Sequence, residues 1–153
     1  MVLELGGGLF SQSQLDDNRK QLGYVSFTGA SFTSANPATD TIQFGPLVQV
    51  GANGMYLYCD LYLPDGCTIL SVIVYGNAGA ANRQYWINRR QPSLNSDIAV
   101  TDLTNVNTIA YPRQVQSGPL DVVDKSKYVY FIAIENLQNG DDIYGGHVAY
   151  TFK

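Results

Sequence analysis

Hydrophobic and polar residues alternate in short runs along the chain from about residue 23 onwards. Turn-forming groups of Gly, Pro, Asn and Asp separate these runs at about 8 to 14 residues, a spacing typical of an all-β domain. The predicted strands are 24–32, 41–50, 55–63, 68–75, 83–90, 98–103, 106–115, 128–135 and 143–152. Their connections are unequal and some are long, which favours a two-sheet β-sandwich of jelly-roll or Greek-key type with eight or nine strands.

The clearest alternation lies in residues 55–63, ahead of a Pro-Asp-Gly turn. One face of this strand is apolar and carries Met55, Leu57, Cys59, Leu61 and Leu63. The other face carries Tyr56, Tyr58, Asp60 and Tyr62. In 41–50 the pair Gly45-Pro46 interrupts the run, which fits a bulge or an edge position.

Two cysteines, Cys59 and Cys67, flank the Pro-Asp-Gly turn. A disulfide requires their Cα atoms to lie within roughly 7 Å. In a tight hairpin the two cysteines would not lie opposite each other but far apart along the paired strands. At a corner between sheets, the distance between the two cysteines would be about one sheet spacing, roughly 10 Å. Both geometries disfavour the bond. We therefore predict a corner between sheets with free, buried thiols that pack as small apolar groups.

The first 22 residues are polar and rich in glycine, with little apolar periodicity. A serine cap would allow a short helix in 11–22, but three preceding glycines favour a flexible arm instead. We therefore divide the chain into an extended N-terminal arm, 1–22, and one sandwich domain, 23–153. The apolar residues of the arm that could contact a neighbouring subunit are Leu9, Phe10 and Leu15.

Charged residues make up only 14% of the chain, the net charge is −4 and the isoelectric point is about 4.7. An acidic chain without a basic stripe is not expected to bind nucleic acid. No apolar run is long enough to span a membrane as a helix. The first residues lack a basic segment followed by a continuous apolar run, so we expect no signal peptide in this chain. Either the protein is made without a signal peptide or one has been removed from it.

Candidate catalytic and metal-binding residues are sparse. The chain has one histidine, His147, and two cysteines whose spacing matches no usual zinc pattern, so we interpret His147 as structural. No phosphate-binding loop, dinucleotide fingerprint or nucleophile motif is present, and no carboxylate pair is placed for catalysis. Asp141 and Asp142 could hold calcium, although turn formation explains them equally well. We expect neither enzymatic activity nor a cofactor.

Aromatic residues are the remaining candidates for a binding surface, since the chain contains 11 tyrosines. The candidate contact residues lie in two predicted strands and are Tyr56, Tyr58, Tyr62, Tyr85 and Trp86. Exposed rings on a sandwich can stack on sugar rings or become buried in a protein interface. The alternative is that the fold itself covers both faces of these strands.

About 30% of the chain lies in two segments, LPDGCTILSVIVYGN (63–77) and VDKSKYVYFIAIENLQNGDDIYGGHVAYTF (123–152). These segments resemble a group of uncharacterised bacterial and phage proteins. The shared features are a Leu-Pro-Asp-Gly corner and a C-terminal Tyr-Gly strand. The resemblance implies a jelly-roll-like sandwich and no known activity. This sequence departs from the pattern at Cys67, where a small residue is usual, and in its glycine-rich start.

Two hypotheses follow for the function. The first is a structural subunit of a virion, such as a capsid decoration or fibre protein, or of another particle surface. It would act by self-association or by binding a capsid or particle lattice. The second is a secreted carbohydrate-binding or lectin-like module whose partner is a glycan. Both hypotheses place the protein on a virion or at an extracellular surface.

Overall fold

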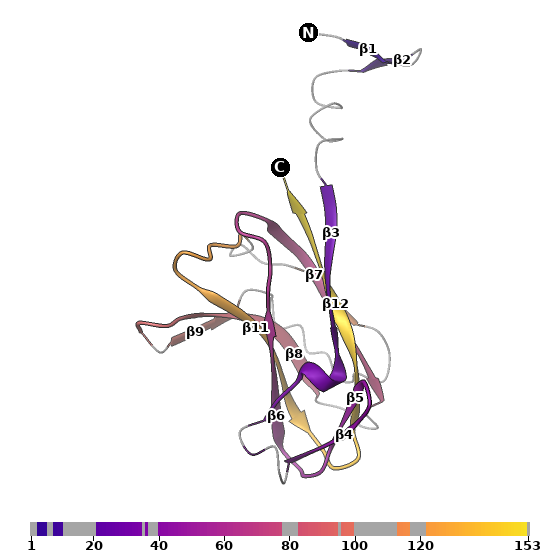
Figure 1. Ribbon diagram of the computed structural model, residues 1–153, viewed down its shortest axis with the longest axis vertical. Coiled ribbons are helices and arrows are strands. Elements are labelled where there is room, and N and C mark those ends of the chain that lie inside the picture. Colours follow the sequence, from indigo (N-terminus) through magenta and orange to yellow (C-terminus); the bar gives the residue numbers. More distant parts are fainter. Residues whose placement is uncertain are drawn as a thin grey trace.

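A computed structural model of the chain describes residues 3–5, 8–10, 21–34, 36, 40–77, 83–94, 96–99, 113–116 and 122–152. Apart from one short 3-10 turn, its named elements are strands (Figure 1). They are β1 (Leu3–Leu5), β2 (Gly8–Phe10), β3 (Gln21–Thr28), η1 (Gly29–Ser31), β4 (Thr41–Phe44), β5 (Leu47–Val50), β6 (Met55–Leu61), β7 (Thr68–Asn77), β8 (Gln84–Gln91), β9 (Ser96–Ala99), β10 (Arg113–Gln116), β11 (Val129–Leu137) and β12 (Asp142–Phe152).

The strands β3 to β12 form two sheets that face each other, as Figure 1 shows. The six-stranded sheet has the order β10-β7-β12-β5-β4, and β3 also pairs with β12. The four-stranded sheet has the order β6-β11-β8-β9, and all pairs in both sheets are antiparallel. From β5 to β12 the chain changes sheet at every connection except the one between β8 and β9. This connectivity is that of a jelly roll, so the predicted fold class is confirmed.

The described part of the sandwich has ten strands, one more than the upper number expected. The difference arises in 41–50, where β4 and β5 pair as a hairpin, with Phe44 opposite Leu47. Gly45 has a φ of 58° and turns the chain between them, a conformation that glycine adopts without steric cost. The prediction of one interrupted strand was therefore wrong. The predicted strands 98–103 and 106–115 overlap β9 and β10 only in part, and their other residues lie outside the described ones.

The Leu-Pro-Asp-Gly segment carries the chain from β6 in one sheet to β7 in the other. Gly66, with a φ of 74°, forms the turn, and its N–H donates to the carbonyl of Val123 at 2.9 Å. The Val123 N–H donates to the carbonyl of Cys67 at 2.9 Å, and the Lys125 N–H donates to Asp65 at 2.8 Å. The segment is thus the predicted corner, and residues 122–125 hold it in place.

Both cysteines are buried and free, as predicted. Burial raises the pKa of each thiol to about 11, and nearby Asp60 and Asp65 raise those of Cys59 and Cys67 respectively. The thiols are therefore protonated at neutral pH and act as packing groups.

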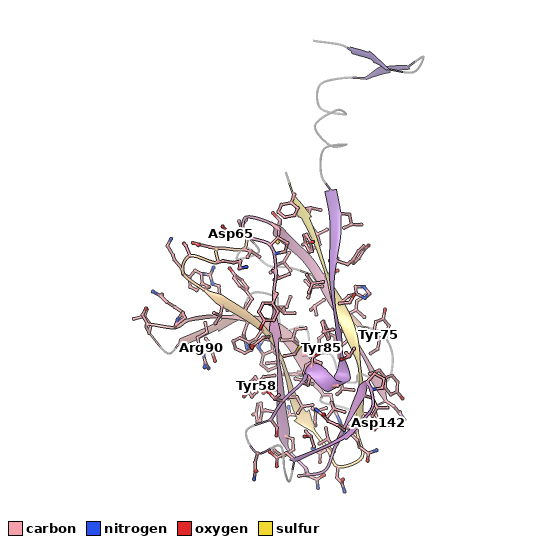
Figure 2. All side chains as sticks on the ribbon, in the orientation of Figure 1. Tyr58, Asp65, Tyr75, Tyr85, Arg90 and Asp142 are labelled. Carbon is pink, nitrogen blue, oxygen red and sulfur yellow. The ribbon has the colours of Figure 1, made fainter. Side chains whose placement is uncertain are left out.

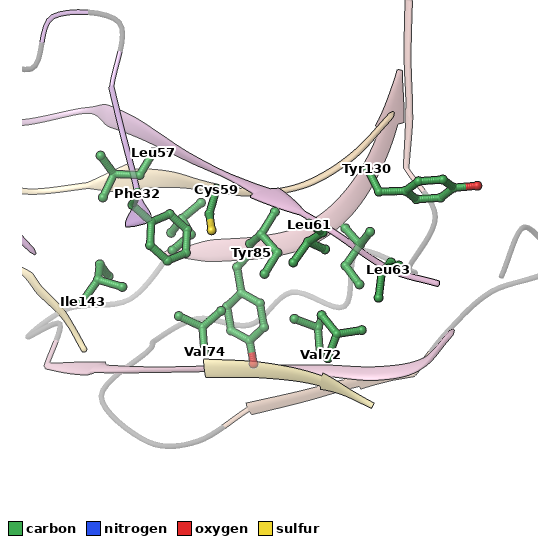
Figure 3. Close-up of a cluster of buried hydrophobic side chains, with 14 of the residues drawn as sticks. Phe32, Leu57, Cys59, Leu61, Leu63, Val72, Val74, Tyr85, Tyr130 and Ile143 are labelled. Atoms are coloured by element: carbon green, nitrogen blue, oxygen red, sulfur yellow. The ribbon is translucent and has the colours of Figure 1, made fainter. Parts of the chain in front are cut away.

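The core lies between the inner faces of the two sheets (Figure 3). Leu57 and Leu61 of β6 face Val72 and Val74 of β7, and the Tyr85 ring lies between the layers. In β6 the core side chains alternate with exposed ones, which explains why the period-2 pattern predicted this strand. In β7 the residues next to Val72 and Val74 are themselves buried or half-buried, so both faces of that strand are covered.

The N-terminal segment is described only in part. β1 and β2 pair with each other, and the arm residues Leu9 and Phe10 lie in β2, whereas Leu15 lies outside the described residues. The sandwich begins with β3, in which Gln21 pairs with Phe152. The assignment of 1–22 as a flexible arm stays a prediction. In the described part of the chain, no helix has the length and apolar character needed to cross a membrane.

Candidate contact surfaces

Four of the five predicted contact residues lie on the outer face of the four-stranded sheet. The register places Tyr58 opposite Ala133, and Ala133 opposite Trp86, so these side chains share one face. Tyr56, Tyr58 and Tyr62 are 44%, 40% and 80% exposed, and Trp86 is half-buried. Tyr85 points the other way and is only 1% exposed, so its ring is part of the core rather than of a contact surface.

The centre of this face is closed by Phe131, which is only 8% exposed. The Tyr58 ring meets it edge-on at 6.0 Å, and the Arg90 guanidinium lies 5.8 Å from the ring centroid. Arg90, which is labelled in Figure 2, in turn donates from Nη2 to Asp97 at 2.8 Å and from Nε to the other carboxylate oxygen. These bonds raise the pKa of Arg90 and lower that of Asp97. Rings and an ion pair therefore fill the middle of the face.

β6 forms an edge of the four-stranded sheet, and its outer edge is only partly paired. Thr33 exchanges two backbone hydrogen bonds with Tyr58, both at 2.8 Å. In the described residues no strand continues this pairing towards Asp60 and Tyr62. A groove of about 340 Å³ follows the open edge, and its far wall includes residues 25–27 of β3.

A second groove, of about 490 Å³, lies on the other side of Tyr62. It is lined by residues 60–63, Lys125 and residues 128–130. Val129 is 51% exposed there, and the Arg89 guanidinium lies 4.2 Å from the centroid of the Tyr128 ring. Because Tyr62 borders both grooves, exposed apolar area gathers at this end of β6, as expected of a protein contact.

The outer face of the six-stranded sheet carries an aromatic strip that the sequence analysis missed. The strip consists of Tyr24 on β3, His147 on β12 and Tyr75 on β7, and we call it the aromatic strip below. The His147 ring centroid lies 5.5 Å from that of Tyr24 and 6.0 Å from that of Tyr75. The sequence signal was only the period-2 position of each residue in its own strand, since register alone brings the three together.

Beside Tyr75 the surface forms a shallow depression of about 310 Å³. It is lined by Phe27, Tyr75, Tyr144, Gly145 and Gly146. Gly145 has a φ of 140°, and a Cβ there would lie 2.3 Å from the Phe27 carbonyl oxygen. The depression therefore depends on the glycines, because a side chain at either position would need the backbone to move.

The two candidate calcium ligands have different surroundings. Asp141 is buried and accepts hydrogen bonds from Arg83 Nε at 2.7 Å, Arg83 Nη2 at 2.9 Å and the Gln138 N–H at 2.9 Å. Asp142 instead accepts a bond from Gln49 Nε2 at 2.9 Å. Within the described ranges, no group of three or more His, Cys, Asp and Glu side chains could hold a metal ion.

Comparison with known proteins gives structural likeness alone. No family model matches the chain, and no curated protein matches it. The C-terminal CBM6 of LamC, a marine laminarinase from Zobellia galactanivorans, is 12% identical with a TM-score of 0.41, covering 82% of this chain and 98% of that one. A chain of the cyanophage Pam1 capsid asymmetric unit is 19% identical with a TM-score of 0.39, covering 88% and 84%. TmCBM61 in complex with β-1,4-galactotriose is 13% identical with a TM-score of 0.37, covering 86% and 88%. We take no function from likenesses this distant.

Proposed function

We propose that the chain is a non-enzymatic structural subunit of a virion or another particle surface that acts by self-association. The observation that carries this proposal is the open edge of β6, flanked by the exposed rings of Tyr58 and Tyr62. Unpaired backbone groups at a sheet edge are a template for another strand, and most proteins cover them or guard them with charges.

The pairing of Thr33 with Tyr58 shows which backbone groups of β6 a partner strand could bond. Alternate residues of a strand direct their backbone N–H and C=O groups to the same edge. Asp60 and Tyr62 therefore direct these groups to the same outer edge at which Tyr58 bonds Thr33. A strand from a partner would continue the ladder from the Thr33 position. The Tyr62 ring and Val129 would then pack against its side chains.

We take the partner strand from the N-terminal arm of a second copy. Pairing β6 with its own copy would bring two Asp60 carboxylates close together, which is unfavourable. The arm has the apolar residues Leu9, Phe10 and Leu15, and their burial against β6 would offset the entropic cost of association. A net charge of only −4 leaves little repulsion between copies.

The test is the mass of the chain in solution from about 1 to 200 μM, measured by light scattering and native mass spectrometry. We expect concentration-dependent oligomers in the intact chain and their loss when residues 1–20 are deleted. Tyr62→Lys should weaken association at least tenfold, because a charge on the edge opposes strand addition. Tyr56→Lys is the matched control on the same strand and should change it less than twofold. A monodisperse monomer over the whole range would refute self-association.

A secreted carbohydrate-binding or lectin-like module is the second candidate, because rings lie exposed on the sheet faces. Tyr56, Tyr58, Tyr62 and Trp86 remain predicted contacts on the four-stranded sheet. A glycan array tests this function, and the absence of any bound glycan would contradict it.

A further inference from the structure

The outer face of the six-stranded sheet can be followed row by row from the strand register. The rows, each across neighbouring strands, are Gln49–Asp142–Asn77, Thr28–Gly145–Tyr75, Ser26–His147–Ile73 and Tyr24–Ala149–Ser71. Residues paired in this way direct their side chains to one face of the sheet. The face therefore combines three aromatic rings with amides, hydroxyls and small residues, and Asp142 is the one carboxylate among the residues named.

The rings form a continuous strip across three adjacent strands, β3, β12 and β7. Tyr24 is 56% exposed, and its ring meets His147 edge-on at an interplanar angle of 83°. At the other end Tyr75 and Tyr144 border the depression beside Gly145, and Tyr144 is 48% exposed. Two strand spacings make the strip roughly 10 Å wide, which exceeds a single sugar ring.

Hydrogen-bonding groups adjoin the rings on one side. The row with Asp142, Gln49 and Asn77 lies next to the row with Tyr75, and Figure 2 shows Tyr75 and Asp142 on the same side of the molecule. Gln49 donates to Asp142 at 2.9 Å, which fixes the orientation of both side chains. The amide oxygen of Gln49, the second carboxylate oxygen of Asp142 and the Asn77 amide can therefore bond a ligand's hydroxyl groups.

We propose that the aromatic strip and the row containing Asp142 form a binding site for a neutral oligosaccharide. Sugar rings would stack their C–H faces on Tyr75 and Tyr24, and their hydroxyls would bond Asp142, Gln49 and Asn77. The proposal deepens the second candidate function. It does not depend on assembly through β6, because the two surfaces lie on different sheets.

Other ligand classes fit this face less well. The named residues include no lysine or arginine, so an anionic glycan or a nucleic acid would find no fixed positive charge to pair with. A peptide strand cannot extend the sheet here, since β12 is already paired along both of its edges. A neutral ring with many hydroxyls needs neither feature.

The experiment uses the intact chain on an array of neutral and anionic glycans, followed by calorimetry with hexasaccharides of glucose, xylose, galactose and N-acetylglucosamine. We expect at least one neutral oligosaccharide to bind. Tyr75→Ala and Asp142→Asn should each weaken binding at least tenfold, and Tyr24→Ala should weaken it severalfold. Tyr75→Phe keeps the ring and should retain most of the affinity, which separates loss of stacking from loss of folding.

The matched control is Leu94→Ala, which removes an exposed apolar side chain from the turn between β8 and β9 of the other sheet and should change affinity less than twofold. The proposal would be overturned if no neutral glycan bound or if only anionic glycans bound. It would also be overturned if Tyr75→Ala left the affinity unchanged. Loss of binding in Tyr56→Ala with retention in Tyr75→Ala would place the site on the four-stranded sheet and also refute it. The mass of each variant tests the assembly through β6 separately.

Discussion

The outer faces of the two sheets both carry tyrosines, yet side chains fill the centre of one face and leave a depression on the other. On the four-stranded sheet the central residue is Phe131, and Tyr58 and Arg90 lie against it. On the six-stranded sheet the central strand has Gly145 and Gly146, and the rings of Tyr75 and Tyr144 border the space above them. The residue between the rings, rather than the number of rings, decides whether a sheet face is filled or hollow.

This difference also separates the energetic roles of the two faces. Phe131 is buried among its neighbours and contributes to stability, whereas Tyr24 is more than half exposed and contributes little. One face is thus an outer extension of the core, and the other leaves its rings available to a ligand.

The largest expected effect is the loss of the ring that fills the four-stranded face. Phe131→Ala should lower the free energy of unfolding by about 3 kcal/mol, because it removes a buried ring and leaves a cavity. Tyr24→Ala on the other face should lower it by less than about 1 kcal/mol. Urea unfolding followed by tryptophan fluorescence measures both values. Equal losses would show that the two faces are filled alike.

A smaller effect is expected at the glycines of the six-stranded face. Gly146→Ala would place a Cβ 2.0 Å from the backbone oxygen of Ile73, and the resulting strain should lower the free energy of unfolding by about 2 kcal/mol. The reverse exchange on the other sheet, Ala133→Gly, should cost about 1 kcal/mol. The same denaturation experiment compares them, and a neutral Gly146→Ala would contradict the close packing beneath the strip.

The smallest effect concerns the ion pair that flanks Phe131. Arg90 lowers the pKa of Asp97 in the folded chain, so the pair stabilises the fold above the ordinary aspartate pKa of 3.8. This stability is lost as the pH falls from about that value through the lowered pKa. Asp97→Asn should therefore reduce thermal stability slightly at pH 7 and leave it unchanged near pH 2. Thermal scans at the two pH values, with and without 1 M salt, provide the measurement. A difference that persists at pH 2 would assign the effect to packing.

Much of the fold could be predicted because each strand encodes its inner face locally. The alternation in β6 identified Leu57, Cys59 and Leu61 as core residues, and Pro-Asp-Gly identified the corner. The hairpin at Gly45-Pro46 was mistaken for one strand, since the same dipeptide suits a bulge and a turn.

The contact surfaces could be predicted only in part. Tyr85 and Trp86 are adjacent in β8, where each face carries one ring together with polar residues, so the sequence does not indicate which ring is buried. The aromatic strip depends on the register of β3, β7 and β12, which lie far apart in the chain. Pairing over such separations follows from the whole fold rather than from local pattern.

Because the two cysteines are buried, the reaction rate of each thiol measures how often the fold opens around it. An alkylating reagent reacts with the thiolate and must be able to reach it. Cys59 and Cys67 are buried on either side of the turn, and their pKa values are raised to about 11. Modification of Cys67 therefore requires the corner to separate from residue 123, whereas Cys59 lines the groove between β6 and β3. The rate at which Cys67 is alkylated in the native protein would measure how often the corner opens, and the rate at Cys59 would report on the groove.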